Sequence, residues 1–382
     1  MDPDQRRCNL VFFGTPPVAA RVLERLWACQ ESHNLRVVGV VTQPPRPQGR
    51  GRQVTPSAVG AAASRLGLDS WRLLTPVSAS DPAFATLLRE ELRPDVCLTA
   101  AYGQYLPSRV LLAPPLGTLN LHPSLLPLYR GAAPVQRALL DGRARSGCSV
   151  LFSVREMDAG PLWAQRVAGL GEAEGAEELQ ERLLNLGLDA FLERLPALRA
   201  FGSAQEAMEK GCRQQDHAAA THAPKLRAEE AELYFALPAR SVHWSVRALQ
   251  GWPGAFARVE VERSNGRGWE PRLWKVLRSS MVEQEEEEAN GPWVGSEPNL
   301  EKSEVLRLLS SPLSPPVGTV RASSTWLRVR CGDGRWLQLE EWVEGGRRAV
   351  EAAAFLRGLG HSADRAGRRV RWAPDPDWRS GM

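Results

Sequence analysis

The sequence lacks the features by which several large classes of protein are recognised. No apolar run approaches the roughly 18 residues that a membrane-spanning helix needs. The six cysteines are scattered, and no two are close enough to form a CxxC pair or a zinc-ligand spacing. The G-x-G-x-x-G fingerprint and the Walker A motif are absent as well. We therefore expect no membrane span and no metal, and the sequence gives little support to hydride transfer or nucleotide hydrolysis.

What is present fits a globular protein of two domains. The chain has 382 residues, of which 43% are hydrophobic and 24% charged, and single cores usually stop growing below this length. The start, MDPDQRRCNLVFF, contains acidic residues and runs into a strand-like segment, so no signal or convincing transit peptide is visible. We expect a cytoplasmic monomer if the source is bacterial, and a mitochondrial or plastid matrix protein if it is eukaryotic.

The first half of the chain alternates short apolar runs with amphipathic stretches. Continuously apolar runs are typical of strands covered on both faces, and the alternation predicts βαβ units with a largely parallel, Rossmann-like α/β sheet. Strands are expected at 9–13, 36–42, 95–101, 118–122 and 148–154, and helices near 17–30, 56–66, 81–92, 107–113, 132–141 and 176–200.

The second half changes character at a polar stretch without a sustained period. We interpret 1–202 as a catalytic domain and 203–225 as a linker. Short β-rich pieces between Gly, Pro and Asn turns predict a small all-β domain over 226–360. An acidic, proline-containing insertion is expected at about 279–316, and an Arg-rich tail at 361–382.

Two polar side chains at the end of the TLNLH segment are candidates for chemistry. Asn120 and His122 are two residues apart, so on a strand they share a face, and Pro123 ends the strand. Ligands of parallel α/β sheets bind at the carboxyl ends of strands. An amide NH₂ can donate to a developing oxyanion, and an imidazole can carry a proton near neutral pH. The pair suits attack on a carbonyl, although a structural role for both residues is the alternative.

A third candidate is Asp158, in the sequence Met-Asp-Ala-Gly-Pro that follows the apolar run ending near Val154. Gly160 allows a tight turn, which would keep the carboxylate at a strand end facing His122. A carboxylate there could orient the imidazole and order a water for proton relay. A plain Asp-Gly turn is the alternative.

Two loops are candidates for binding. The proline-braced, apolar segment at 123–136 could hold a flat ligand against backbone groups. The loop at 42–53 carries Arg46, Arg50 and Arg52 between glycines and prolines, and no acidic residue occurs from Ser32 to Leu68. Flexible arginines of this kind can contact a phosphate backbone, so RNA is a candidate partner; a solvated basic loop is the alternative.

Taken together, these motifs resemble the formyltransferase family that uses 10-formyltetrahydrofolate. The resemblance is carried by Asn-Leu-His-Pro-Ser-Leu-Leu-Pro at 120–127, Arg-Gly-Ala-Ala-Pro-Val-Gln at 130–136 and Asp-Ala-Gly at 158–160. The segments FFGTP (12–16), VVTQPPRPQGRGR (40–52), AAYGQYLP (100–107) and ATHAPKL (220–226) are similar to the tRNA-specific members. The resemblance extends from about residue 9 to about residue 360.

The resemblance implies formyl transfer from 10-formyltetrahydrofolate to the α-amine of methionyl-initiator tRNA, by a Rossmann-like domain followed by an OB-like barrel. In that scheme Asn120 polarises the formyl oxygen, His122 manages protons and Asp158 holds His122 and a water. Ser124, Leu125, Leu126 and Pro127 would line the folate site. The loop with Arg46, Arg50 and Arg52 would reach the acceptor end of the tRNA, and the β domain would contact its flank.

Other functions stay open on the sequence. His122-Pro123 and Asp158-Ala-Gly-Pro look more like the purine-pathway members that formylate glycinamide ribonucleotide, and the acidic insertion is unusual for the family. Hydrolysis of 10-formyltetrahydrofolate, and RNA binding by an inactive enzyme scaffold, are further alternatives.

Overall fold

The structure is a computed structural model of the whole chain. It describes residues 6–48, 53–262, 267–282, 318, 320–322, 327–344, 350–351 and 370–372. The chain divides into two compact units. Unit 1 comprises 1–135, 144–170 and 177–225, and unit 2 comprises 136–143, 171–176 and 226–382.

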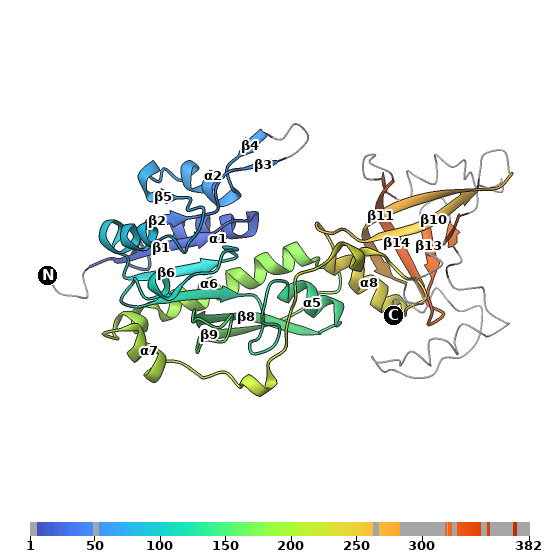
Figure 1. The fold of residues 1–382 in the computed structure, drawn as a ribbon. Helices are drawn as coiled ribbons and strands as arrows, with labels where there is room; N and C mark the ends of the chain where they lie inside the picture. Colours follow the sequence, from blue (N-terminus) through green and yellow to red (C-terminus); the bar gives the residue numbers. More distant parts are fainter. Residues whose placement is uncertain are drawn as a thin grey trace. The chain divides into compact units, whose positions relative to one another are not determined.

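Unit 1 is built on a seven-stranded sheet in the order β5-β2-β1-β6-β7-β8-β9 (Figure 1). The neighbouring pairs from β5 to β7 are parallel, whereas β8 is antiparallel to both β7 and β9. The apolar runs predicted as covered strands are almost entirely buried, which explains why they do not alternate. The strands are β1 (Cys8–Gly14), β2 (Leu35–Val41), β5 (Leu73–Leu74), β6 (Val96–Ala100), β7 (Thr118–His122), β8 (Arg145–Phe152) and β9 (Leu162–Gly169).

Helices follow the strands along this half of the chain. The first begins at a proline, whose fixed φ suits a first helical turn, and turns its apolar face inward. A separate two-stranded hairpin, β3 (Arg46–Gln48) with β4 (Gln53–Thr55), carries the basic loop. The helices are α1 (Pro17–Ala28), α2 (Ala58–Arg65), α3 (Pro82–Leu87), α4 (Ser108–Leu111), α5 (Pro134–Leu140), α6 (Ala176–Arg199) and α7 (Ala204–Lys210).

Among its described residues, unit 2 contains an antiparallel sheet, helix α8 and residues 136–140 of α5. The strand order is β12-β13-β14-β11-β10-β16, and β15 pairs with β14. Trp274 and Trp342 are fully buried and stack with ring centroids 5.0 Å apart, which forms the centre of the core. The elements are α8 (Ala239–Ala248), β10 (Phe256–Glu262), β11 (Trp269–Met281), β12 (Val320–Ala322), β13 (Leu327–Arg330), β14 (Trp336–Glu344), β15 (Val350–Glu351) and β16 (Val370–Trp372).

The predicted fold class is confirmed: a mostly parallel α/β domain precedes an antiparallel β domain. The α-helices and strands that were not predicted are α7, α8, β3, β4, β5, β9, β15 and β16. The stretch interpreted as a linker clusters with unit 1 and begins with α7. Three residues of the range expected to be a tail form β16, which pairs with β10. In the part of the chain that the structure describes, no helix is long and apolar enough to span a membrane.

Candidate active site

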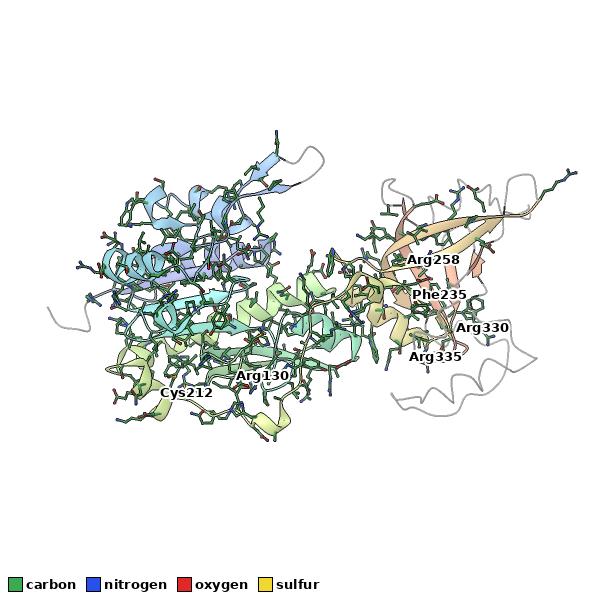
Figure 2. The ribbon with its side chains drawn as sticks, in the orientation of Figure 1. Arg130, Cys212, Phe235, Arg258, Arg330 and Arg335 are labelled. Carbon is green, nitrogen blue, oxygen red and sulfur yellow. The ribbon has the colours of Figure 1, made fainter. Side chains whose placement is uncertain are left out.

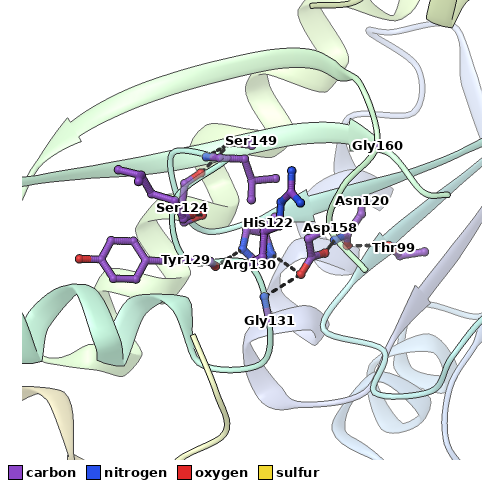
Figure 3. Close-up of polar contacts among 12 residues, drawn as sticks. Thr99, Asn120, His122, Ser124, Tyr129, Arg130, Gly131, Ser149, Asp158 and Gly160 are labelled. Atoms are coloured by element: carbon purple, nitrogen blue, oxygen red, sulfur yellow. Dashed lines mark hydrogen bonds and ion pairs between the residues drawn. The ribbon is translucent and has the colours of Figure 1, made fainter. Parts of the chain in front are cut away.

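The site begins at the carboxyl end of β7, where the strand pairs with β6 on one side. Thr99 of β6 lies directly opposite Asn120 of β7 in the parallel register. The Thr99 hydroxyl donates a 2.7 Å hydrogen bond to Asn120 Oδ1 (Figure 3). Because Oδ1 is an acceptor only, this bond fixes the orientation of the amide and leaves both Nδ2 protons for the other side. Asn120 therefore presents a donor group toward Asp158, whose Oδ1 lies 3.5 Å from Nδ2.

His122 is the last residue of β7 and is 4% exposed. Its Nε2 lies 2.8 Å from the carbonyl oxygen of Tyr129, which can only accept a hydrogen bond. The proton of the neutral ring is therefore on Nε2, and Nδ1 has the free lone pair. Nδ1 lies 3.6 Å from Asp158 Oδ2, so the atom of His122 that can take up a proton faces a carboxylate.

Asp158 joins the two polar residues from a tight turn between β8 and β9. Its backbone has φ of 52°, in the left-handed region that non-glycine residues seldom occupy. Besides His122, its Oδ2 accepts a 2.9 Å hydrogen bond from the backbone N–H of Gly131. One carboxylate thus contacts a strand-end imidazole, a strand-end amide and the loop after β7.

These three residues line a cavity of about 550 Å³ in unit 1. A cavity with a few convergent polar groups on a mainly apolar wall is typical of a site for a small molecule. Tyr102, a lining residue, has a buried hydroxyl without a hydrogen-bond partner among the described residues, and burial raises its pKa to about 12. The hydroxyl therefore stays protonated at neutral pH and can donate a hydrogen bond. Apolar lining residues include Leu106, Leu111, Leu151, Val154, Met157 and Leu184.

The sequence predicted that Asn120, His122 and Asp158 share one site, and in the structure Asp158 lies close to both Asn120 and His122. The predicted folate-lining residues are placed differently. Ser124 and Leu126 are buried, Leu125 and Pro127 are half-buried, and none of the four is among the residues that line the cavity. The loop that contains them is hydrogen-bonded to β8 in the interior of the unit.

The inward bonds of that loop run through Ser149 of β8. The Ser149 hydroxyl donates to the carbonyl oxygen of Ser124 at 2.7 Å and accepts from the backbone N–H of Leu126 at 3.1 Å. Leu126 also packs with Leu151 and Leu162 in a small core cluster. A direct contact between this loop and folate stays a prediction.

Of the predicted tRNA-binding residues, Arg46 is exposed at the start of the β3–β4 hairpin. Arg50 and Arg52 lie outside the described residues. The structure adds residues that sequence reasoning missed: Thr99, which orients Asn120, and 101–106, which line the cavity. A signal for the second group was present, because AAYGQYLP is one of the segments that carry the resemblance.

Both halves of the chain match known protein families. A family model described as formyl transferase matches residues 8–195, and one described as formyl transferase, C-terminal domain, matches residues 225–360. The methionyl-tRNA formyltransferase of Roseiflexus castenholzii is 36% identical over 351 residues, which cover 92% of this chain and 96% of that one. That of Thermotoga maritima is 36% identical and covers 75% of this chain and 87% of its own.

Solved structures show the same fold at lower identity. An N-formyltransferase from Helicobacter canadensis, in complex with folinic acid and dTDP-3-aminofucose, has a TM-score of 0.52 and 11% identity, covering 87% of this chain and 98% of that one. HypX from Aquifex aeolicus in complex with tetrahydrofolic acid has a TM-score of 0.53 and 15% identity, covering 92% of this chain and 47% of that one.

Proposed function

Because this chain belongs to the formyl transferase family, we propose that it transfers the formyl group of 10-formyltetrahydrofolate to the α-amine of methionyl-initiator tRNA. The observation that carries the proposal is the match along nearly the whole length of a methionyl-tRNA formyltransferase, through the catalytic half and the β domain alike.

The geometry of the site supports this chemistry. The amine nitrogen attacks the formyl carbon, the C–N bond forms, and the carbonyl electron pair moves onto oxygen. Asn120 Nδ2 is held by Thr99 in the orientation that donates to this oxyanion. When the tetrahedral intermediate collapses, the bond from carbon to N10 of the folate breaks and the carbonyl re-forms.

His122 and Asp158 handle the proton that the amine loses. Nδ1 of His122 is the basic atom, since Tyr129 keeps the other ring proton on Nε2. Nδ1 accepts the amine proton, Asp158 Oδ2 stabilises the resulting imidazolium across 3.6 Å, and the proton is then returned to N10. Every step uses side chains of this chain, and we propose no metal ion.

The tRNA contacts are proposed on charge and exposure. Arg46 is exposed on the β3–β4 hairpin, and the predicted residues Arg50 and Arg52 belong to the same basic loop. If the loop contacts phosphates, tRNA affinity should fall steeply with salt. Arg50→Ala should weaken tRNA binding and flatten that salt dependence while leaving folate binding intact; an unchanged salt dependence would remove the loop from the interface.

A release assay tests the function as a whole. The protein is incubated with 10-formyltetrahydrofolate and one of three acceptors, namely methionyl-initiator tRNA, glycinamide ribonucleotide or water, and tetrahydrofolate release is followed. Of the three acceptors, we expect only methionyl-initiator tRNA to support tetrahydrofolate release, in an amount equal to the formylmethionyl-tRNA that forms. Release with glycinamide ribonucleotide or with water alone would replace the proposal by a small-molecule formyltransferase or a hydrolase. Light scattering on the same sample checks the monomeric state that we propose.

A further inference from the structure

The segment between α7 and unit 2 is bonded to both loops of the candidate active site. At one end, Arg213 and Leu162 exchange backbone hydrogen bonds of 2.8 and 3.0 Å. At the other, the backbone N–H of Arg130 donates to Thr221 O at 2.8 Å, and that of Ala223 donates to Arg130 O at 2.7 Å. Residues 213–223 thus form a brace, running beside the turn after β8 and the loop after β7.

Gln215 is the point of this brace where the two loops meet. It is 6% exposed. Its Nε2 donates to the carbonyl oxygens of Asp158 at 2.9 Å and Gly160 at 2.7 Å. Its Oε1 accepts from Arg130 through Nε at 3.2 Å and Nη2 at 2.8 Å. Carbonyls only accept and a guanidinium only donates, so the amide can satisfy all four bonds in one orientation only.

The two loops that Gln215 joins are the ones that set the geometry of His122. The Asp158 turn supplies Oδ2 for Nδ1 of the imidazole, and its left-handed backbone needs support from outside. Arg130 stands between Tyr129, whose carbonyl accepts from Nε2, and Gly131, whose N–H donates to Asp158 Oδ2 (Figure 3). Arg130 is itself buried, and Figure 2 labels its position.

We infer that Gln215 is a positioning residue for the proposed reaction, which acts through Asp158: its single amide keeps the carboxylate turn and the loop after β7 at the separation that His122 requires. The inference rests on the proposed function. Gln215 is not among the residues that line the cavity. Its loss should therefore lower turnover and leave the affinity for 10-formyltetrahydrofolate nearly unchanged.

A matched pair of substitutions separates this role from general stability. Gln165 has the same pattern of bonds in the same unit: Nε2 donates to Leu126 O at 3.0 Å and Ser149 Oγ at 2.9 Å, and Oε1 accepts from Arg213 at 2.8 Å. It does not bond to the Asp158 turn. Both Gln215→Glu and Gln165→Glu keep the acceptor for arginine and replace the donor by an oxygen.

We expect Gln215→Glu to lower kcat at least tenfold, with KM for 10-formyltetrahydrofolate within threefold of the wild type. Gln165→Glu should keep kcat within threefold, and melting temperatures show the loss of stability in each. Equal losses of kcat in the two variants would overturn the inference. Should Gln215→Glu fail to fold, Gln215→Asn keeps both polar groups one methylene shorter, and an unchanged kcat in that variant would also overturn it.

A double-mutant cycle tests whether the effect passes through Asp158. In an Asp158→Asn background, Gln215→Glu should change the remaining turnover less than threefold, because the turn no longer presents a carboxylate. If Gln215→Glu lowered kcat by the same factor in Asp158→Asn as in the wild type, the inference would be contradicted. Failure of the wild type to formylate methionyl-initiator tRNA would instead refute the proposed function. The ratio of variant to wild-type turnover would then be measured with whichever acceptor, glycinamide ribonucleotide or water, supports tetrahydrofolate release.

Discussion

Gly160 provides the sharpest test of the claim that the position of Asp158 determines turnover. A Cβ built at Gly160 would lie 1.8 Å from the carbonyl oxygen of Phe152, whereas real Cβ atoms essentially never come within 3.0 Å of a non-bonded heavy atom. Phe152 ends β8 inside the sheet, so in Gly160→Ala the turn must move. The distance between the new Cβ and the Phe152 carbonyl oxygen must increase by about 1.2 Å to reach 3.0 Å.

A movement of that size is large on the scale of the site. The hydrogen bond from Gly131 N–H to Asp158 Oδ2 is 2.9 Å long, and it would be lost if the carboxylate shifted with the turn. Misplacing a reacting group by about 1 Å can reduce rates by about a hundredfold. We therefore expect Gly160→Ala to lower kcat about a hundredfold in the formylation assay.

Gly169→Ala is the matched control, because a Cβ there meets no atom within 4 Å. Gly169 ends β9, the strand that follows the same turn. Kinetics and melting temperature are measured for both variants with methionyl-initiator tRNA and 10-formyltetrahydrofolate. If Gly160→Ala retained kcat within threefold of Gly169→Ala while both were folded, the dependence of the reaction on the Asp158 turn would be refuted.

Three further predictions concern the oxyanion donor, a buried histidine and the core of unit 2. Asn120→Ala should lower kcat at least a hundredfold, as expected for the loss of an oxyanion donor of about 2.7 to 4 kcal/mol, with little change in KM; near-normal turnover would remove Asn120 from the mechanism. Burial holds the pKa of His243 below its ordinary value, so stability should be greatest above about pH 6.5 and fall as pH drops through the lowered value. The free energy of unfolding in urea, measured from pH 8 to 5, should depend less on pH in His243→Gln than in the wild type. An equal pH dependence in the two proteins would contradict this role of His243. Trp342→Ala leaves Trp274 without its stacking partner and should lower the free energy of unfolding by about 3 to 5 kcal/mol; a loss below about 1 kcal/mol would mean that the core collapses around the gap.

The sequence predicted the parts of the site that depend on one segment at a time. Asn120 and His122 share a face because strand side chains repeat every two residues, and Pro123 marks the strand end. The turn at Asp158 follows from the glycine two residues later. Each of these signals is local, so it can be taken from the chain without knowledge of its neighbours.

Contacts between distant segments could not be predicted in this way. That Thr99 faces Asn120 depends on the register of β6 with β7, and that Gln215 reaches Asp158 depends on where a polar stretch runs. Ser124 is buried because Ser149 draws its loop inward. Periodicity contains no information on any of these three pairings.

Two missed helices did leave local signals. Ser203 accepts a hydrogen bond from the backbone N–H of Glu206, which is the Ser-x-x-Glu pattern of a helix N-terminus, and it precedes α7. In α8 the buried residues Ala239, Val242 and Val246 repeat at helical spacing. By contrast, β9 is half exposed toward its end and was obscured by the Gly-Pro turn before it.

The brace at 213–223 also determines where this protein can be divided. A fragment that stops at residue 202, the boundary suggested by composition, would leave the N–H of Arg130 and the carbonyls of Asp158 and Gly160 without the partners that now bond them. A fragment that ends at Lys225 keeps every one of these bonds and matches the limit of unit 1. Cleavage between residues 202 and 213 with loss of the C-terminal part should therefore disable the catalytic half, whereas cleavage after Lys225 should keep these bonds and remove residues 226–382.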